Sequence, residues 1–225
     1  YRLRGAKHFV TDAGIADLII VVARGDEGLV LLPVEKGATG LTITATPGID
    51  ATRKLYTVEF DNVAVPEANA LAFTTKTKAA LESATDIANV ALCAEMLGGM
   101  QWTLETTVEY AKTRQQFGKA IATFQVLQHR MVDMFMASEE SYSMALRATI
   151  LLGGTDEERA KAVSAAKVSI GKHSRFVGQA AVQIHGGMGV TDEMRVGHYF
   201  KRVTMLDATF GNVDYHLRRF TALNA

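Results

Sequence analysis

The placement of proline is the feature that most constrains how this 225-residue chain can fold. All three prolines, Pro33, Pro47 and Pro66, lie in the first 66 residues, and the rest of the chain has none. Because proline breaks helices, a long proline-free segment favours long helices. The sequence therefore predicts a β-rich part followed by a helical part.

The first part carries short apolar runs rich in β-branched residues, separated by Gly, Pro and Asp. Strands are predicted over 18–23, 28–34, 41–45 and 56–65, with a turn at 24–27 between the first two. Nothing that resembles a crossover helix separates these runs. The sheet is therefore expected to be largely antiparallel.

The second part has the apolar periodicity of helices. Long helices are predicted over about 78–113 and 123–152, and Thr155-Asp156-Glu157-Glu158 has the form of a capping box that opens a third. The glycines of 186–189 should end this helix, and two shorter helices should follow.

The predicted fold class is α+β, with an antiparallel β-domain followed by an antiparallel helical bundle. The β-domain is assigned to residues 1–72 and the bundle to residues 73–225. Tyr1 is not an initiator Met and the chain opens at once in patterned sequence, so a segment is expected to be missing upstream.

Composition excludes several classes of function. Lys plus Arg and Asp plus Glu both number 24, so the chain lacks the basic excess typical of nucleic-acid-binding proteins. Its apolar runs are far shorter than a membrane span requires. The lone Cys93 excludes internal disulfides and cysteine-based zinc sites and fits a reducing compartment, so a cytoplasmic location is expected. The six histidines lack metal-ligand spacing, and no metal site is expected.

Two helical segments carry residue types that suit a bound nucleotide. Arg114, Gln116 and Phe117 combine a cation, an amide and an aromatic ring, which suits a pyrophosphate beside an aromatic ring system. Phe124 and Gln125 open the next helix. The structural alternative is a helical hairpin with a basic last turn and a glycine stop, and this segment alone favours that alternative.

The second helical segment follows Gln183, where the paired glycines Gly186 and Gly187 either let a ligand approach the backbone or simply end a helix. In the β-rich part, Phe9 places an aromatic ring beside the hydroxyl of Thr11, which is a weak pattern by itself.

Together, and in this order, these segments resemble the acyl-CoA dehydrogenase family. Gly5–Ala13 resembles the signature of its central β-domain, and Phe60–Pro66 resembles the strand that closes that domain. Residues 110–134 resemble its most specific helical signature, and Gln183–Val190 its late glycine motif. The resemblance covers essentially the whole chain. It implies that an N-terminal helical domain and the first β-strands precede Tyr1.

The resemblance implies FAD as cofactor, an acyl-CoA thioester as substrate and an electron-transfer flavoprotein as electron acceptor. It places Phe9 and Thr11 against the flavin, with the Thr11 hydroxyl near N5. The residues that it places at the ADP part of FAD in the adjacent subunit are Arg114, Gln116, Phe117, Phe124, Gln125, Gln183, Gly186 and Gly187. A dimer of dimers is the family pattern, so a homo- or hetero-tetramer is expected.

The position of the catalytic base is where the chain departs from the family. The family reaction removes a proton α to the thioester with a glutamate and passes a β-hydride to the flavin. The usual glutamate position falls at Phe210, and the position used by a minority of members falls at Ala88. Neither side chain can take a proton.

Two aspartates lie near this position in the sequence. Asp207 precedes Phe210 and Asp214 follows it, and both are candidates for an alternative base. The structural alternative for both is solvent exposure or a local ion pair with Arg202 or Arg218.

One branch of the family reconciles these features. Asp50–Arg53, His185–Glu193, Gly197–Arg202 and His216–Phe220 resemble the smaller subunits of bacterial pimeloyl- and steroid-side-chain-type dehydrogenases. The preferred prediction is an acyl-CoA dehydrogenase subunit whose glutamate comes from a partner subunit. The alternatives are a self-sufficient dehydrogenase that uses one of the two aspartates, a flavin-dependent monooxygenase on the same fold, and a structural subunit without flavin.

Overall fold

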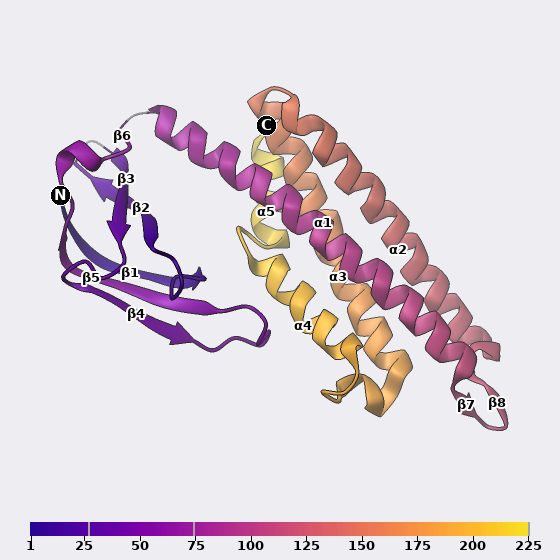
Figure 1. Cartoon of the computed structure of the whole chain (residues 1–225). Helices are drawn as coiled ribbons and strands as arrows, with labels where there is room; N and C mark the ends of the chain where they lie inside the picture. The colour runs from indigo at the N-terminus through magenta and orange to yellow at the C-terminus, as the bar shows by residue number, and fades with distance from the viewer. Residues whose placement is uncertain (27, 74, 225) are drawn as a thin grey trace. The chain divides into compact units, whose positions relative to one another are not determined.

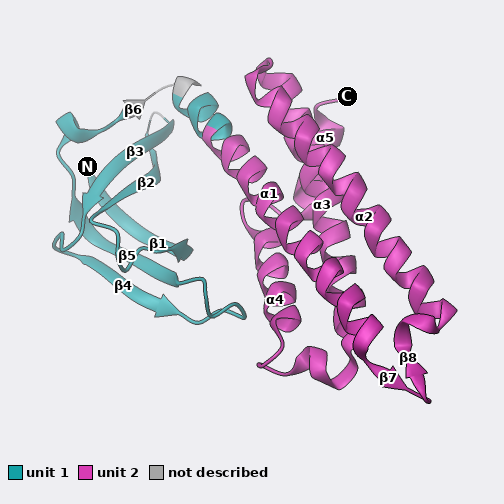
Figure 2. Cartoon of the chain, turned by 45° about the vertical axis from the view of Figure 1, so that its right-hand side comes forward, with its two compact units in different colours: residues 1–83 teal, residues 84–225 magenta. Residues whose placement is uncertain are grey.

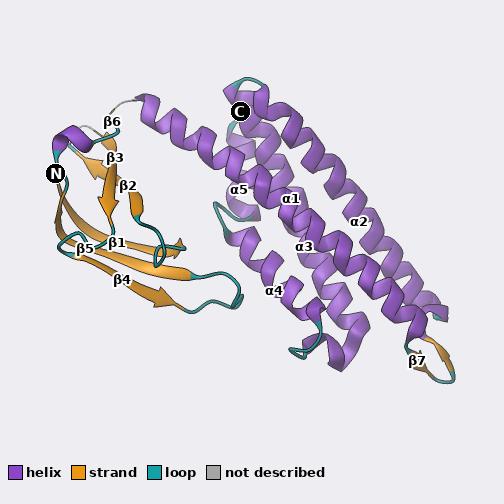
Figure 3. Cartoon of the chain, viewed as in Figure 1, coloured by secondary structure: helices purple, strands orange, loops and turns teal. Residues whose placement is uncertain are grey.

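The computed structural model describes residues 1–26, 28–73 and 75–224. Figure 2 colours its two compact units, Tyr1–Ser83 and Ala84–Ala225. Strands predominate in the first unit and helices in the second, as Figure 3 shows. The predicted α+β class is confirmed.

Within the described residues, the first unit forms two three-stranded sheets (Figure 1). One sheet has the order β1–β5–β4, with β1 at Arg2–Thr11, β5 at Leu55–Ala64 and β4 at Leu41–Thr46. The other has the order β2–β3–β6, with β2 at Leu18–Gly25, β3 at Gly28–Glu35 and β6 at Ala72–Phe73. These strands pair antiparallel, as predicted.

The core of the first unit follows from the two-residue period of its strands. Val30, Leu32 and Val34 on β3 are buried, whereas the residues between them are only partly covered. Val58 and Val63 on β5 are buried in the same apolar cluster. This alternation is the signal that predicts half-buried strands.

The strand predictions need two corrections. Strand β1 was not predicted, because nearly all its side chains are exposed and it lacks an apolar run. Arg24 and Gly25 belong to β2, where they pair with Leu29 and Gly28, instead of forming the turn. The last residue of the predicted turn, Glu27, lies outside the described residues.

The described part of the second unit contains three long and two shorter helices (Figure 1). They are α1 (Thr75–Thr113), α2 (Gln125–Ile150), α3 (Asp156–His185), α4 (Arg195–Ala208) and α5 (Val213–Ala222). The predicted bundle with two short final helices is therefore confirmed. Helix α1 runs through the division between the units, and the domain boundary at 72/73 stays a prediction.

Local sequence explains where these helices begin and end. The predicted capping box is present: Thr155 Oγ1 accepts from the Glu158 amide, and the Thr155 amide donates to the Glu158 carboxylate. Helix α2 is shorter than predicted, because Ile121–Thr123 and Leu151–Gly153 wind as 3-10 turns, here η2 and η3.

The core of the second unit is apolar and rich in methionine. Met96 and Met100 on α1, Met134 on α2, Ile170 on α3 and Leu206 on α4 are all fully or almost fully buried. None of the described helices combines the length and apolarity needed to cross a membrane.

Candidate functional site

The ends of α1 and α2 are joined by a tight hairpin instead of the predicted simple helical turn. Strands β7 (Gln115–Gln116) and β8 (Lys119–Ala120) pair antiparallel. Phe117 and Gly118 form the turn with φ of 54° and 77°, the left-handed conformation that two-residue hairpins require. Sequence reasoning missed the hairpin because phenylalanine rarely adopts this conformation.

The hairpin presents a cation, amides and aromatic rings to solvent. Phe117 is 90% exposed, and its ring meets the edge of Phe124 at a centroid distance of 6.1 Å. Lys119 Nζ lies 4.5 Å from the centroid of the Phe124 ring. Arg114 and Gln125 are exposed beside them. A nearly fully exposed phenylalanine with adjacent cations is typical of a surface that binds a ligand or a partner.

The late glycine motif lies at the same end of the bundle. The rings of Tyr110 on α1 and His185 on α3 stack at a centroid distance of 4.2 Å, and Tyr110 Oη donates to the His185 carbonyl at 3.5 Å. These contacts join the last turn of α1 to the last turn of α3. The structure therefore brings together the two helical segments that the sequence singled out.

His185 is buried, and burial lowers the pKa of its ring below the ordinary value for histidine. Its Nδ1 lies 2.9 Å from the Ala181 carbonyl oxygen. Its Nε2 is buried without a hydrogen-bond partner among the described residues. The neutral His185 ring is therefore held in place at the end of α3.

Gly186 and Gly187 differ in why they are glycines. Gly186 caps α3 with φ of 60° and ψ of −138°, a conformation that only glycine adopts readily, and its amide donates to the Gln183 carbonyl. A Cβ at Gly187 would meet nothing within 4 Å. Gly186 therefore serves the turn, and Gly187 leaves backbone open to solvent. The glycine pair can therefore both end the helix and let a ligand approach the backbone.

In the first unit, a β-bulge presents Phe9. The register between β1 and β5 shifts between Lys7 and Val10, where Phe9 has a φ of 56° and is 69% exposed. Thr11 ends the strand with an exposed side chain.

The corner between α4 and α5 holds the position where the family's usual base would stand. Phe210 has a φ of 53° and is 53% exposed. Its carbonyl accepts hydrogen bonds from His216 Nε2 at 3.1 Å and from Asn89 Nδ2 at 3.5 Å. Asn89 directly follows Ala88 in α1, so this hydrogen bond ties the turn of α1 that holds Ala88 to the corner that holds Phe210.

A buried lysine supports this corner from α3. The Lys167 ammonium donates to the carbonyl oxygens of Leu206, Asp207 and Thr209 at 3.1, 3.2 and 3.0 Å. These carbonyls lie at the C-terminal end of α4, where a cation is favourable, and the Leu206 carbonyl also accepts from the Thr209 amide at 3.2 Å. Burial lowers the pKa of Lys167 below its ordinary value.

A histidine and an ion pair hold α5 against the rest of the bundle. Burial lowers the pKa of His216 to about 4, so its ring is neutral at physiological pH and donates through Nε2. Arg219 donates to both carboxylate oxygens of Asp86 on α1 at 2.6 and 3.1 Å. The backbone around Phe210 is thus fixed from α1, α3 and α5.

The structure corrects what was expected of Asp207. It is only 3% exposed and pairs with Arg175, whose Nη2 lies 3.1 Å from Oδ2. It pairs with neither predicted arginine; Arg202, for example, forms an ion pair with Glu95. Asp207 Oδ1 has no hydrogen-bond partner among the described residues and packs against Gly171.

Asp214 is exposed in the first turn of α5, as the structural alternative predicted. Asp207 and Asp214 line one cleft of about 310 Å³ with Arg175, and Phe210 does not line that cleft. The two carboxylates therefore lie apart from the corner position of the Phe210 side chain.

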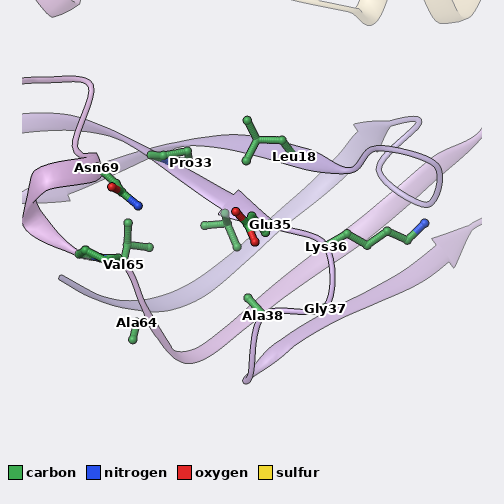
Figure 4. A pocket seen from close by; sticks show the side chains of 11 residues that line it. Leu18, Pro33, Glu35, Lys36, Gly37, Ala38, Ala64, Val65 and Asn69 are labelled. Carbon is green, nitrogen blue, oxygen red and sulfur yellow. The ribbon is translucent and has the colours of Figure 1, made fainter.

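Two further hollows contain none of the predicted site residues. The first unit has a hollow of about 350 Å³ lined by Leu18, Pro33, Lys36 and Asn69 among others (Figure 4). An apolar groove of about 700 Å³ runs between α1 and α2 and is lined by Leu104, Val108, Met131, Val132 and Phe135 with an acidic rim. Within the described residues, no cluster of His, Cys, Asp or Glu could hold a metal ion.

Sequence reasoning missed the supporting residues of the site. Lys167 lies on the apolar stripe of α3, and a polar residue at such a position is a signal that could have found it. Asn89 carries no such signal, because its role depends on a carbonyl 121 residues away in the sequence. His216 lies only six residues from the same carbonyl, but no local motif marks this contact.

Comparison with known proteins gives a consistent result over the whole chain. A family model described as "Acyl-CoA dehydrogenase, C-terminal domain" matches residues 78–222, and one described as "Acyl-CoA dehydrogenase, middle domain" matches residues 1–63.

The curated proteins that are similar to the chain include two bacterial dehydrogenases. The L-prolyl-(peptidyl-carrier protein) dehydrogenase of Serratia sp. is 33% identical over 86% of this chain and 52% of that protein. The short-chain-specific acyl-CoA dehydrogenase of Megasphaera elsdenii is 30% identical over 89% of this chain and 54% of that protein. The chain thus spans about half the length of the curated relatives that it matches.

A solved structure described as "PigA with FAD and proline" superimposes on all of the chain. It has a TM-score of 0.91 and 27% identity, and the match covers 100% of this chain and 61% of that one.

Proposed function

Because the chain belongs to the acyl-CoA dehydrogenase family, we propose that it is a subunit of a FAD-dependent enzyme that dehydrogenates the α,β-bond of an acyl-CoA thioester. The observation that carries the proposal is the surface at one end of the bundle. There an exposed cation, exposed amides, an exposed aromatic ring and open glycine backbone come together. This combination suits the ADP part of a dinucleotide.

The residues present fit FAD. The set proposed for its ADP part in the adjacent subunit is Arg114, Gln116, Phe117, Phe124, Gln125, Gln183, Gly186 and Gly187. Arginine would supply charge for a phosphate, the amides would supply orientation, and Gly187 would supply room because no atom lies within 4 Å of its Cβ position.

The flavin ring is assigned to the first unit. Phe9 would lie against the ring, since the bulge turns its side chain to the surface, and the Thr11 hydroxyl would donate a hydrogen bond to N5. When bound, FAD would supply the hydride acceptor for the β-carbon of the substrate.

A glutamate from a partner subunit is proposed as the base. Phe210 and Ala88 cannot accept a proton. Asp207 is engaged by Arg175, and Asp214 is exposed, whereas a base for this reaction works best where water is excluded. These features favour the partner-supplied glutamate over a self-sufficient enzyme.

A tetramer with copies of this chain or with a related subunit is proposed as the working assembly. The apolar groove between α1 and α2 supports it, because large exposed apolar surfaces typically become covered by a partner. An electron-transfer flavoprotein is proposed as the electron acceptor.

The experiment that tests this function is anaerobic visible spectroscopy of the FAD-loaded protein with a panel of acyl-CoA thioesters and an L-prolyl thioester. We expect bound flavin that stays oxidised in this chain alone and bleaches once a homologous subunit with the glutamate is added. Bleaching by the chain alone would favour the self-sufficient alternative.

The remaining alternatives are distinguished by follow-up measurements on the same protein, with air admitted to the reduced flavin in the first of them. Oxygen uptake by the reduced flavin with an oxygenated product would indicate a monooxygenase. If the chain binds no FAD, either alone or with the homologous subunit, the result would indicate a structural subunit without flavin. Bleaching of the flavin by the prolyl thioester and by none of the acyl-CoA thioesters would indicate that the substrate is a carrier-bound amino acid, as the name of the Serratia relative describes for that protein.

A further inference from the structure

The loop between β4 and β5 carries, near its end, an arginine that contacts a proposed flavin-binding residue. Arg53 Nη2 donates a hydrogen bond to Thr11 Oγ1 at 3.5 Å. Arg53 is half-buried, and its Nε is buried without a hydrogen-bond partner among the described residues. The guanidinium is therefore held partly inside the protein, although the function proposed above gives it no role.

The turn that carries Arg53 is fixed by its own hydrogen bonds. The buried carboxylate of Asp50 accepts from the Thr52 amide at 3.0 Å and from the Thr52 hydroxyl at 2.6 Å. The Arg53 amide donates to the Asp50 carbonyl at 3.1 Å. Such an Asx-type turn holds its residues in one conformation.

The same loop is tied to the end of β1. The Asp12 amide donates to the Lys54 carbonyl at 2.9 Å, and Thr11 pairs with Leu55 across the sheet. Arg53 and Thr11 are therefore held next to each other by backbone contacts on both sides.

The donor and acceptor groups of Arg53 and Thr11 determine where the hydrogen of the Thr11 hydroxyl can point. A guanidinium can only donate, whereas a threonine hydroxyl has one hydrogen to donate and lone pairs to accept. Because Arg53 uses a lone pair of Thr11 Oγ1, the Thr11 hydrogen must point elsewhere. Within the described residues, no protein acceptor takes that hydrogen.

We propose that Arg53 is a positioning residue, which orients the hydroxyl of Thr11 as a hydrogen-bond donor toward an acceptor nitrogen of bound oxidised flavin. The proposal rests on the proposed function, which puts Thr11 against the flavin. A charged donor also polarises the hydroxyl and so makes it a stronger donor.

The test is a double-mutant cycle on the dissociation constant for oxidised FAD, measured by fluorescence titration of the full chain. Thr11→Val and Arg53→Gln should each weaken FAD binding about three- to tenfold, the range of one hydrogen bond. Glutamine has an acceptor oxygen that can take the Thr11 hydrogen back into the protein. The double variant should bind no more weakly than Thr11→Val.

Two further variants separate orientation from charge and from folding. Arg53→Lys keeps a cation that only donates and should stay within about twofold of the wild-type affinity. Lys54→Gln removes a charge from the same loop and should leave the affinity unchanged. Thermal unfolding and the visible flavin spectrum of each variant are recorded, because a folding defect lowers the melting temperature, whereas a lost hydrogen bond to the flavin changes its absorption band.

The possible results distinguish failure of this inference from failure of the proposed function. If Arg53→Gln weakens binding equally with and without the Thr11 hydroxyl, Arg53 does not act through Thr11, and the inference fails while the proposed function stands. An Arg53→Lys variant that binds as weakly as Arg53→Gln also overturns it. A wild-type chain that binds no FAD overturns the proposed function and this inference together.

Discussion

Asn89 Nδ2 donates a hydrogen bond to the carbonyl oxygen of Phe210 across 121 residues of sequence. This contact joins the first long helix to the corner between α4 and α5. Because Asn89 follows Ala88, the contact ties together the two positions to which the resemblance assigns a catalytic glutamate. Ala88 and Phe210 are both apolar, so neither can accept a proton.

Phe210→Glu is predicted to give the chain a catalytic base of its own. The substitution adds no backbone strain, because phenylalanine already occupies the left-handed conformation with Gly211 after it. A positioned general base contributes roughly a hundredfold or more. We therefore expect acyl-CoA to bleach the flavin of this variant at least about a hundredfold faster than that of Phe210→Gln, which has the same shape and accepts no proton. Equal rates in stopped-flow absorbance would show that residue 210 does not face the substrate.

Asp207→Ala is predicted to lower stability and leave the reaction intact. The substitution leaves Arg175 unpaired, but that side chain is about half exposed and can be solvated, so the free energy of unfolding should fall by about 1–2 kcal/mol. Asp214→Ala, on the exposed face of α5, should change it by about 0.5 kcal/mol or less. Urea unfolding measures both. A large loss of flavin reduction in Asp207→Ala, with FAD still bound to the complex, would instead identify Asp207 as the base.

His216 is predicted to make the protein sensitive to acid. Its folded pKa of about 4 lies below the ordinary value of 6.5, so between these values the unfolded chain binds more protons. Stability contributed by the neutral ring is therefore complete above pH 6.5 and is lost as the pH falls toward 4. The loss amounts to about 3 kcal/mol.

His216→Gln provides the control for this pH dependence, because glutamine can donate to the Phe210 carbonyl but does not titrate. The difference between wild type and this variant in unfolding free energy should change with pH only over that acidic interval. A parallel pH dependence of the two proteins would exclude His216 as the cause.

The parts of the fold that depend on local sequence were predictable. The alternation of Val30, Leu32 and Val34 predicts β3, and Thr155 with Glu158 predicts the start of α3, because neighbours in the chain decide both. Strand β1 was not predicted because its side chains are mostly exposed and give no apolar pattern. It is a strand because it pairs with β5.

The candidate site likewise has some residues that the sequence alone could predict and others that depend on long-range packing. Arg114, Phe117 and the glycine pair could be singled out from the sequence, because their residue types and order carry the resemblance. The ion pair of Asp207 with Arg175 could not be inferred, because it depends on how α3 and α4 pack against each other. Long-range packing, which no local pattern encodes, therefore fixes the corner around Phe210.

Gly186 and Gly187 should respond differently to alanine. Gly186→Ala forces a side chain into a conformation that favours glycine, so the free energy of unfolding should fall by about 1–3 kcal/mol although no atom lies in the way. Gly187→Ala meets open space and has no positive φ, so stability should stay within about 0.5 kcal/mol. If a nucleotide approaches this backbone closely, the methyl group should nevertheless weaken FAD binding about tenfold or more. Thermal unfolding and FAD titration of the two variants separate these effects, and an unchanged FAD affinity in Gly187→Ala would remove the glycine motif from the proposed binding surface.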